Sequence, residues 1–205
     1  RKVAMTKVFD ENSQAAPVTV VKLDDNNVTE TKTKEKHGYV AVQVGGFAIK
    51  EKKLNKPALG AFKKKEIQAL KPLKEYRVDD VSSYKVGEAL NVETLLTPGM
   101  KVDVRGKSIG KGFQGCIKRY NHGRGPMSHG SKFHRSMGSI GAGTTPGRVV
   151  RGLHMPGHMG DDNVCARRLT VVRVDTEKGL LLVRGSVPGV DGGLVVISAS
   201  ITKWN

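Results

Sequence analysis

A glycine-rich stretch near the middle of the chain has the spacing of a phosphate-binding loop. Residues 110–115 read Gly-Lys-Gly-Phe-Gln-Gly and match the G-x-G-x-x-G pattern of dinucleotide sites. Such a site also needs a helix after the glycines and an acidic residue about twenty positions further on, which binds the ribose. Asn121 and Gly123 disfavour a helix here, and the next acidic residue is Asp161. We therefore do not expect a dinucleotide-binding enzyme.

Histidines in the same region have spacings that occur in metal sites. His129 and His134 are five positions apart, and His154 and His158 are four apart. Two histidines at i and i+4 share a helix face, but a Pro-Gly dipeptide interrupts the second pair. Residues 105–160 also contain no carboxylate that could complete or orient a set of metal ligands. We expect no metal, no cofactor and no catalytic residue, so the sequence favours a binding protein over an enzyme.

The distribution of charge is the strongest signal in the sequence. The chain has 205 residues, a net charge of +16 and an isoelectric point near 10.0. Residues 105–160 carry +10 of that charge, because they contain ten Lys or Arg side chains and no Asp or Glu. They also hold 14 of the 25 glycines and too few apolar residues to fold alone. Such a segment predicts a polyanionic partner, and nucleic acid in particular.

The side chains of this segment suit RNA. Lys and Arg would neutralise phosphates, and imidazoles would stack on bases or hydrogen-bond to phosphate and 2′-hydroxyl groups. RNA is favoured over DNA because the sequence contains no helix-turn-helix, zinc finger or basic zipper to enter a major groove. The alternative is a general basic nucleic-acid-binding protein or RNA chaperone. We expect the RNA-binding residues to be Lys107, Lys111, Lys118, Arg119, Arg124, His129, Lys132, His134, Arg135, Arg148, Arg151 and His154.

Short runs with β-strand character flank the basic segment on both sides, separated by turn-forming residues. They predict a mainly β fold, in which an antiparallel β-barrel core is interrupted by a long, irregular, basic and glycine-rich loop. The core would comprise residues 1–104 with 161–205, and the loop residues 105–160. The expected strands are Ala4–Phe9, Val18–Leu23, Val28–Lys32, Tyr39–Val44, Tyr76–Val78, Lys101–Val104, Arg168–Val174, Leu180–Val183 and Leu194–Ile197.

Three further features concern the core. The lysine-rich residues 50–75 are interpreted as a mixed insert, and a short helix is expected at Val92–Leu96, with Asn91 as its N-cap. Val172 is expected in the core, so that Val172→Asp would unfold it by burying an unpaired charge. Two cysteines are too few for a disulfide framework. No apolar run approaches the ~18 residues of a membrane span, and we expect no membrane partner.

Several short sequence motifs resemble those of a known family. They are Lys111–Gly115, Gly125–Arg135, Gly138–Val149, Met155–Gly160, Val171–Asp175 and Leu180–Gly189. With them, nearly the whole chain resembles the L-three family of large-subunit ribosomal proteins, of the bacterial or organellar type. Members of this family have a β-barrel on the outer surface of the subunit, and a long loop runs from it through the ribosomal RNA toward the peptidyl transferase centre.

The resemblance implies roles for particular parts of this chain. Residues 105–160 would be the inward loop, and residues 136–148 its innermost part. The protein would act early in subunit assembly and lie beside the ribosomal proteins L-fourteen and L-nineteen. Its loop tip near the peptidyl transferase centre would consist of Gly141, Ala142, Gly143, Thr144 and Thr145.

The sequence departs from the family at two places that bear on its type. Ala4 stands where the family often has Gly before Met-Thr. The tip has no Gln, so the methylated glutamine of some bacterial members is not expected. The Gly-Ala-Gly-Thr-Thr-Pro tip resembles cyanobacterial and plastid members, and Arg1 in place of Met would fit a trimmed N-terminus. These features favour a plastid ribosome, with the bacterial cytoplasm as the alternative.

Overall fold

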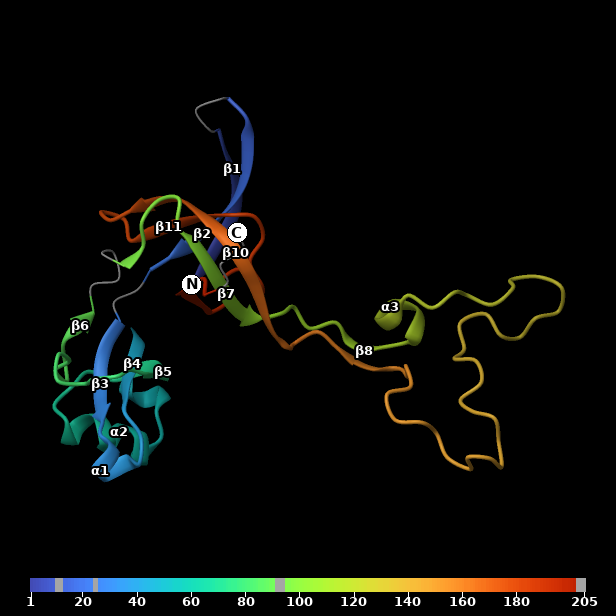
Figure 1. Ribbon diagram of the computed structural model, residues 1–205, viewed down its shortest axis with the longest axis horizontal. Coiled ribbons are helices and arrows are strands. Elements are labelled where there is room, and N and C mark those ends of the chain that lie inside the picture. Colours follow the sequence, from blue (N-terminus) through green and yellow to red (C-terminus); the bar gives the residue numbers. More distant parts are fainter. Residues whose placement is uncertain (10–12, 24–25, 91–94, 202–205) are drawn as a thin grey trace.

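The chain folds mainly into antiparallel β-strands (Figure 1). The computed structural model describes residues 1–9, 13–23, 26–90 and 95–201. The expected mainly β, antiparallel class is confirmed. The elements are β1 (Lys2–Phe9), β2 (Ala15–Lys22), β3 (Asn26–Lys32), α1 (Lys34–His37), β4 (Ala41–Ala48), the 3₁₀ turn η1 (Glu51–Lys53), α2 (Lys56–Lys64), β5 (Leu70–Arg77), β6 (Ala89–Leu90), β7 (Lys101–Lys107), β8 (Gly112–Gln114), α3 (Cys116–Tyr120), β9 (Gly157–Met159), β10 (Asn163–Asp175), β11 (Leu180–Arg184) and β12 (Val195–Ala199).

Six strands form the larger sheet, in the order β1-β2-β11-β10-β7-β12. Its strands are rich in Val and Leu, which favour extended backbone, and their side chains alternate between the two faces. In β7, for example, Val102 and Val104 are buried, whereas Lys101 and Arg105 are exposed. The buried faces meet in one core, which consists of Val21, Leu96, Val102, Val104, Val171, Leu181, Val183 and Val187.

The two edges of the larger sheet approach each other at one corner. The Lys2 amide donates to the Gly193 carbonyl at 3.0 Å, and the Gly192 amide donates to the Lys2 carbonyl at 2.8 Å. Gly192 and Gly193 lie just before Leu194, which is followed by the first residue of β12. Within the described residues, no strand ladder joins β1 to β12. The sheet is therefore strongly curved, and a closed barrel is not shown.

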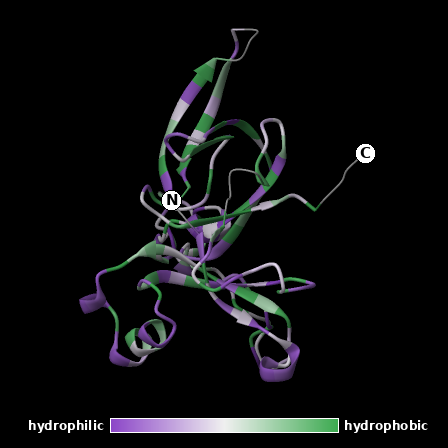
Figure 2. Cartoon of the chain, turned by 90° about the vertical axis from the view of Figure 1, so that its left-hand side faces the viewer, coloured by the Kyte–Doolittle hydropathy of each residue, from purple (hydrophilic) through white to green (hydrophobic). Residues whose placement is uncertain are grey.

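The remaining core strands form a second sheet, with the order β5-β4-β3-β6. With α1, η1 and α2 it makes a smaller lobe below the larger sheet in Figure 1. The sequence suggested a single β core with a mixed insert at 50–75. In the structure, β4 pairs with β5, which begins within that insert, and β3 pairs with β4 and β6, so these strands form a sheet of their own. Val28, Val42 and Val44 form the centre of this lobe. Figure 2 shows the hydrophobic colours concentrated on the strands and hydrophilic colours on the helical segments.

The helices of the insert were not predicted individually. Asn55 caps α2, because its side-chain oxygen accepts a hydrogen bond from the Ala58 amide at 3.3 Å. Phe62 turns inward from α2 and packs with Ala69 and Leu70. The expected helix at 92–96 falls largely outside the described residues, which resume at Leu95. No helix in the described part of the chain is long and apolar enough to cross a membrane.

Candidate nucleic-acid interface

Residues 108–162, here called the arm, leave the larger sheet at the end of β7 and return at the start of β10 (Figure 1). These two strands are antiparallel neighbours, and Lys107 pairs with Asn163 where the arm begins. The Ser108 amide then donates to the Asp162 carbonyl at 2.9 Å. Further out, β8 and β9 continue the antiparallel pairing. The base of the arm is therefore a narrow two-stranded stem anchored in the larger sheet.

One glycine of the stem is required by a close approach of two backbone segments. Gly160 has φ +75°, in the left-handed region, and a Cβ built on it would lie 2.2 Å from the Ile109 carbonyl oxygen. Any other residue would strain the backbone and push the two sides of the stem apart. The glycine content of the basic segment is thus partly explained by the packing of the arm against itself.

Beyond the stem, α3 packs against the returning chain. The Cys116 thiol is buried and donates to the His154 carbonyl, with the sulfur 3.3 Å from the oxygen. Arg119 donates from Nη1 to the Met155 carbonyl at 2.8 Å. The Tyr120 ring stacks on the His154 imidazole, with ring centroids 4.0 Å apart and planes 5° apart. We call these five residues the α3 cluster, and they close the proximal part of the arm.

The sequence did not lead us to predict α3. Asn121 and Gly123 were expected to prevent a helix after the glycine motif, yet α3 forms a single short turn before them. It ends at Asn121, which adopts the left-handed conformation with φ 58°. Asn is one of the few residues that tolerates this conformation. The breakers therefore set where α3 ends and do not prevent it from forming.

The distal part of the arm, residues 121–156, contains no helix or strand. The His154 and Met155 carbonyls accept hydrogen bonds from the α3 cluster, whereas the backbone hydrogen bonds described between residues 121 and 153 are local. The Gly125 amide donates to the His134 carbonyl at 3.1 Å, and the imidazole Nδ1 of His134 donates to the Pro126 carbonyl at 2.9 Å. Residues 141–150, which include the expected tip, are all exposed. An extended chain of this kind has no core of its own and offers its whole length to a partner.

Most of the expected binding residues are exposed cations without an anionic neighbour. Within the described residues, no ion pair involves the seven exposed cations of the arm. Exposed His129 and His154 lie on the arm as well, whereas His134 is half-buried by its contact with Pro126. Arg119 is half-buried in the α3 cluster and has its guanidinium bonded to backbone. The seven cations are Lys111, Lys118, Arg124, Lys132, Arg135, Arg148 and Arg151.

Lys107 differs from the other expected binding residues. It lies at the end of β7, and its Nζ is 2.8 Å from an Asp161 carboxylate oxygen. The hydrogen bond from Lys107 holds the pKa of the Asp161 carboxyl below its ordinary value of 3.8. Because the ion pair spans the base of the arm, Lys107 also contributes to the stem, and its contact with RNA stays a prediction. No local pattern predicts this pairing, because Lys107 and Asp161 are far apart along the chain.

The arm also exposes large apolar side chains, which were not among the expected RNA-binding residues. Phe113 on β8 is 77% exposed, and Met127, Phe133 and Val150 are also largely exposed. Large apolar groups exposed along one segment mark an interaction surface. The signal was present in the sequence, as apolar residues that follow neither the helical nor the strand period. Together with the cations, these side chains suit a partner that offers both phosphates and flat apolar rings.

The histidines do not form a metal site within the described residues. His122 and His154 lie near each other, with ring centroids 5.7 Å apart, but they are grouped with Tyr120. In the described part of the chain, no group of three or more His, Cys, Asp or Glu side chains could hold a metal ion. Of these rings, His154 stacks on Tyr120, whereas the His122 ring is tilted against both.

These features define a class of protein: a compact β scaffold that holds out a long cationic arm. Comparison with known proteins identifies the family. The model of the family described as ribosomal protein L3, called uL3 below, matches residues 75–180. This span includes the whole arm and the strands that anchor it.

The similarity extends over almost the whole chain. It is 52% identical over 96% of its length to the large ribosomal subunit protein uL3 of Trichormus variabilis, covering 92% of that protein. It is 50% identical to the uL3 of Nostoc punctiforme and 47% identical to that of Thermosynechococcus vestitus, with 96% of this chain covered in both and 93% and 92% of those proteins. The chain belongs to the uL3 family of ribosomal proteins and resembles the cyanobacterial type.

Proposed function

We propose that the protein is a structural constituent of the large ribosomal subunit that binds and stabilises the subunit's ribosomal RNA through the arm. The observation that carries this proposal is the set of seven exposed, unpaired cations on an extended chain. Ten cations without an acidic residue in 56 positions would repel one another unless a polyanion neutralised them. RNA phosphates supply that neutralisation, and release of their counterions drives binding.

In this proposal the chain divides between a scaffold and an RNA-binding loop. Residues 1–104 and 161–205 provide the scaffold, and residues 105–160 the loop. The bonds between Lys2 and the Gly192–Gly193 turn support a β-barrel for the larger sheet in the assembled particle. A rigid scaffold fixes where the loop starts and ends, so the loop loses less entropy when it becomes ordered on RNA.

The finer assignments rest on family membership. By family, the tip at Gly141–Thr145 would reach toward the peptidyl transferase centre, and the protein would act early in subunit assembly. Its protein neighbours would be the family's partners L-fourteen and L-nineteen. The cyanobacterial character of the relatives supports a plastid ribosome. Sedimentation of the native protein from isolated chloroplasts would test both location and assembly, because it should travel with the large subunit.

A binding experiment tests the RNA-binding role directly. The full chain is titrated with a cyanobacterial large-subunit RNA transcript over a range of KCl concentrations, with duplex DNA as the competitor. We expect a steep loss of affinity with salt, at about 0.7–0.9 in log–log slope per phosphate contact. The triple variant Arg124→Gln, Lys132→Gln, Arg135→Gln should lower this slope by about 2–3. Equal affinity for RNA and duplex DNA would instead favour a general basic nucleic-acid-binding protein.

A further inference from the structure

A second concentration of positive charge lies outside the arm. Residues 50–74 contain nine Lys and two Glu, a net charge of +7 in 25 positions. The basic segment 105–160 carries +10 and the whole chain +16. The other 124 residues therefore carry a net charge of −1. The net positive charge of the protein is confined to two separate segments, of which the arm accounts for only one.

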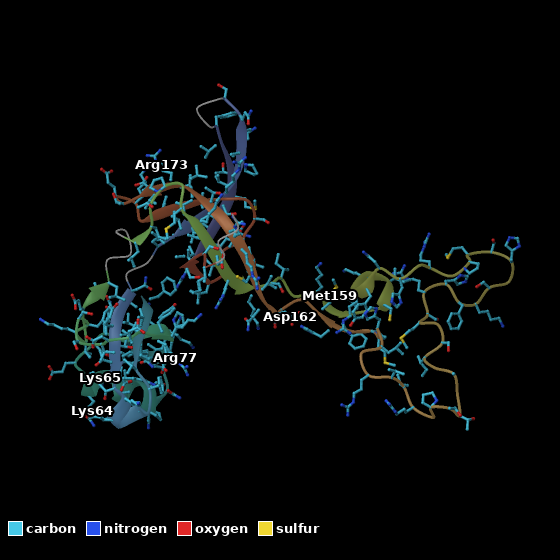
Figure 3. All side chains as sticks on the ribbon, viewed as in Figure 1. Lys64, Lys65, Arg77, Met159, Asp162 and Arg173 are labelled. Atoms are coloured by element: carbon cyan, nitrogen blue, oxygen red, sulfur yellow. The ribbon has the colours of Figure 1, made fainter. Side chains whose placement is uncertain are left out.

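The second segment belongs to the smaller lobe. Its lysines lie on η1, on α2 and on the flanking chain, at the far end of that lobe from the larger sheet (Figure 1). In Figure 3, Lys64 and Lys65 at this end are well separated from Met159 and Asp162 in the stem of the arm. One RNA segment that lies along the arm would therefore not cover the smaller lobe as well.

The packing of α2 directs these lysines outward. Phe62 is the buried residue of the helix, and it packs against Ala69 and Leu70. With this side turned inward, Lys56 and Lys64 are on the exposed side of the helix. On η1, no residue is buried. We define the lysine surface as Lys50, Lys52, Lys53, Lys56 and Lys64, all of which are exposed.

Acidic residues do not compensate this surface. Two other lysines of the segment have acidic neighbours: Lys65 lies 3.0 Å from Glu30, and Lys63 lies 3.9 Å from Glu51. For the five residues of the lysine surface, the described part of the chain provides no ion pair. Five exposed cations on two consecutive short elements repel one another, and a polyanion would relieve that repulsion.

Gly60 gives an independent sign of a partner on this surface. It lies one helical turn from both Lys56 and Lys64, and it is exposed. A Cβ at Gly60 would meet no atom within 4 Å, so the packing of the protein does not require glycine there. Glycine weakens a helix, and an exposed helical glycine without a side chain leaves room for the close approach of another molecule. The neighbouring Ala61 is exposed and small, so few side-chain atoms project from the helix surface between Lys56 and Lys64.

We propose that the lysine surface binds the phosphate backbone of a second RNA segment, distinct from the RNA bound by the arm. The choice of RNA rests on the proposed function. Protein interfaces are enriched in Arg, Met and aromatic side chains and depleted in Lys, whereas residues 50–71 contain no Arg and no exposed large apolar side chain. The lysine ammonium contacts phosphate as a point charge. The protein thus links two RNA segments through two chemically different surfaces.

The test compares two triple variants with equal loss of charge. The first is Lys52→Gln, Lys56→Gln, Lys64→Gln, and the matched control is Lys7→Gln, Lys85→Gln, Lys178→Gln, whose residues are exposed elsewhere. Both full chains are titrated with a cyanobacterial large-subunit RNA transcript at several KCl concentrations. We expect the first variant to lose about 2–3 in salt slope and at least about tenfold in affinity, and the control to lose much less.

Hydroxyl-radical footprinting separates this proposal from the arm's role. The lysine-surface variant should lose one protected stretch of RNA and keep the stretch that the arm variant Arg124→Gln, Lys132→Gln, Arg135→Gln loses. If the arm variant alone binds normally, the proposed arm function fails while the lysine surface stands. If the lysine-surface variant matches its control in slope and footprint, or loses only a cross-link to a neighbouring protein, the inference is overturned.

A variant at Gly60 tests the geometry without changing charge. Gly60→Gln places a side chain between Lys56 and Lys64, and Gln favours a helix more than Gly does. We expect weaker RNA binding with a melting temperature that is equal or higher. Unchanged RNA affinity would show that nothing approaches this part of α2 and would count against the proposal.

Discussion

Tyr120 and His154 form a parallel ring stack that joins the outgoing and returning halves of the arm. The centroids are 4.0 Å apart, the Arg119 guanidinium carbon lies 5.0 Å from the centre of the Tyr120 ring, and the Cys116 thiol bonds to the His154 backbone. The stack therefore divides the arm into a proximal part with fixed geometry and a distal part that is held only by local bonds.

Removing this stack should loosen the arm and leave the scaffold intact. Tyr120→Ala would lose a ring pair that contributes about 0.5–1.5 kcal/mol. We expect faster amide hydrogen exchange at the α3 cluster and a several-fold loss of RNA affinity. Tyr120→Phe keeps the ring and should restore both properties. Equal behaviour of the Ala and Phe variants would contradict a role for stacking.

The stem should be sensitive to a single methyl group at Gly160. In Gly160→Ala, the new Cβ would clash with the Ile109 carbonyl, and the residue would have to keep φ +75°. Strain of this kind costs about 1–3 kcal/mol. We expect loss of protection at the Lys111 amide, which bonds to Met159 across the stem. Gly123→Ala is the control, because a Cβ there meets no atom within 4 Å and φ is not positive.

An acidic substitution on the arm should weaken RNA binding, whereas one in the core should unfold the scaffold. Arg124→Glu changes an exposed side chain, so the free energy of unfolding should change by no more than about 0.5 kcal/mol while RNA affinity falls. Val171→Asp places a carboxylate where the side chain is 1% exposed and should unfold the larger sheet. Thermal melting with RNA titration measures both effects. A similar loss of melting temperature in the two variants would refute the separation of arm and scaffold.

Phe113 should contribute to binding and not to folding. With 77% of the residue exposed, Phe113→Ala removes little buried surface and should not change the melting temperature. Stacking of a ring on a nucleic-acid base contributes about 1–3 kcal/mol, so RNA affinity should fall correspondingly. Phe113→Trp should retain affinity because it preserves a flat ring. A lower melting temperature in Phe113→Ala would show that the ring is structural instead.

The ion pair at the base of the arm predicts a dependence on pH. Lys107 holds the pKa of Asp161 below 3.8, so the pair stabilises the stem above that value and loses its effect as the pH falls through the folded-state pKa. Carbon-detected NMR of the Asp161 carboxyl should show this low pKa. In Lys107→Gln it should rise toward the ordinary value. An unchanged titration would show that Lys107 is not its partner.

The sequence predicted most strands of the scaffold but not their assembly. Val residues that alternate with charged residues identify β7, and the short apolar run Leu180–Val183 identifies β11, each within a few residues of its observed bounds. The division into two sheets depends on long-range pairing, such as Val44 with Lys74, which no local pattern encodes. A register shift in β10 also places Val171 in the core and Val172 only half-buried, contrary to the sequence-based choice of Val172.

The candidate interface was predictable in composition but not in internal contacts. The absence of acidic residues from 105–160 led to the prediction of exposed, RNA-binding cations; Arg124 and Arg148 are exposed, and their contact with RNA stays a prediction. The roles of Arg119 and Lys107 could not be inferred, because each depends on a residue brought near by the fold of the arm. Their side chains fix the arm's own geometry, a role that charge alone does not reveal.

Lys107 and Asn163, which flank the arm, lie opposite each other at the end of one antiparallel ladder. Such an attachment is geometrically equivalent to a hairpin turn, so the length of what lies between these residues does not alter the hydrogen bonding of the strands below. Insertions or deletions in the distal chain would therefore be tolerated by the scaffold. The length of the arm can therefore vary without changing the stability of the scaffold.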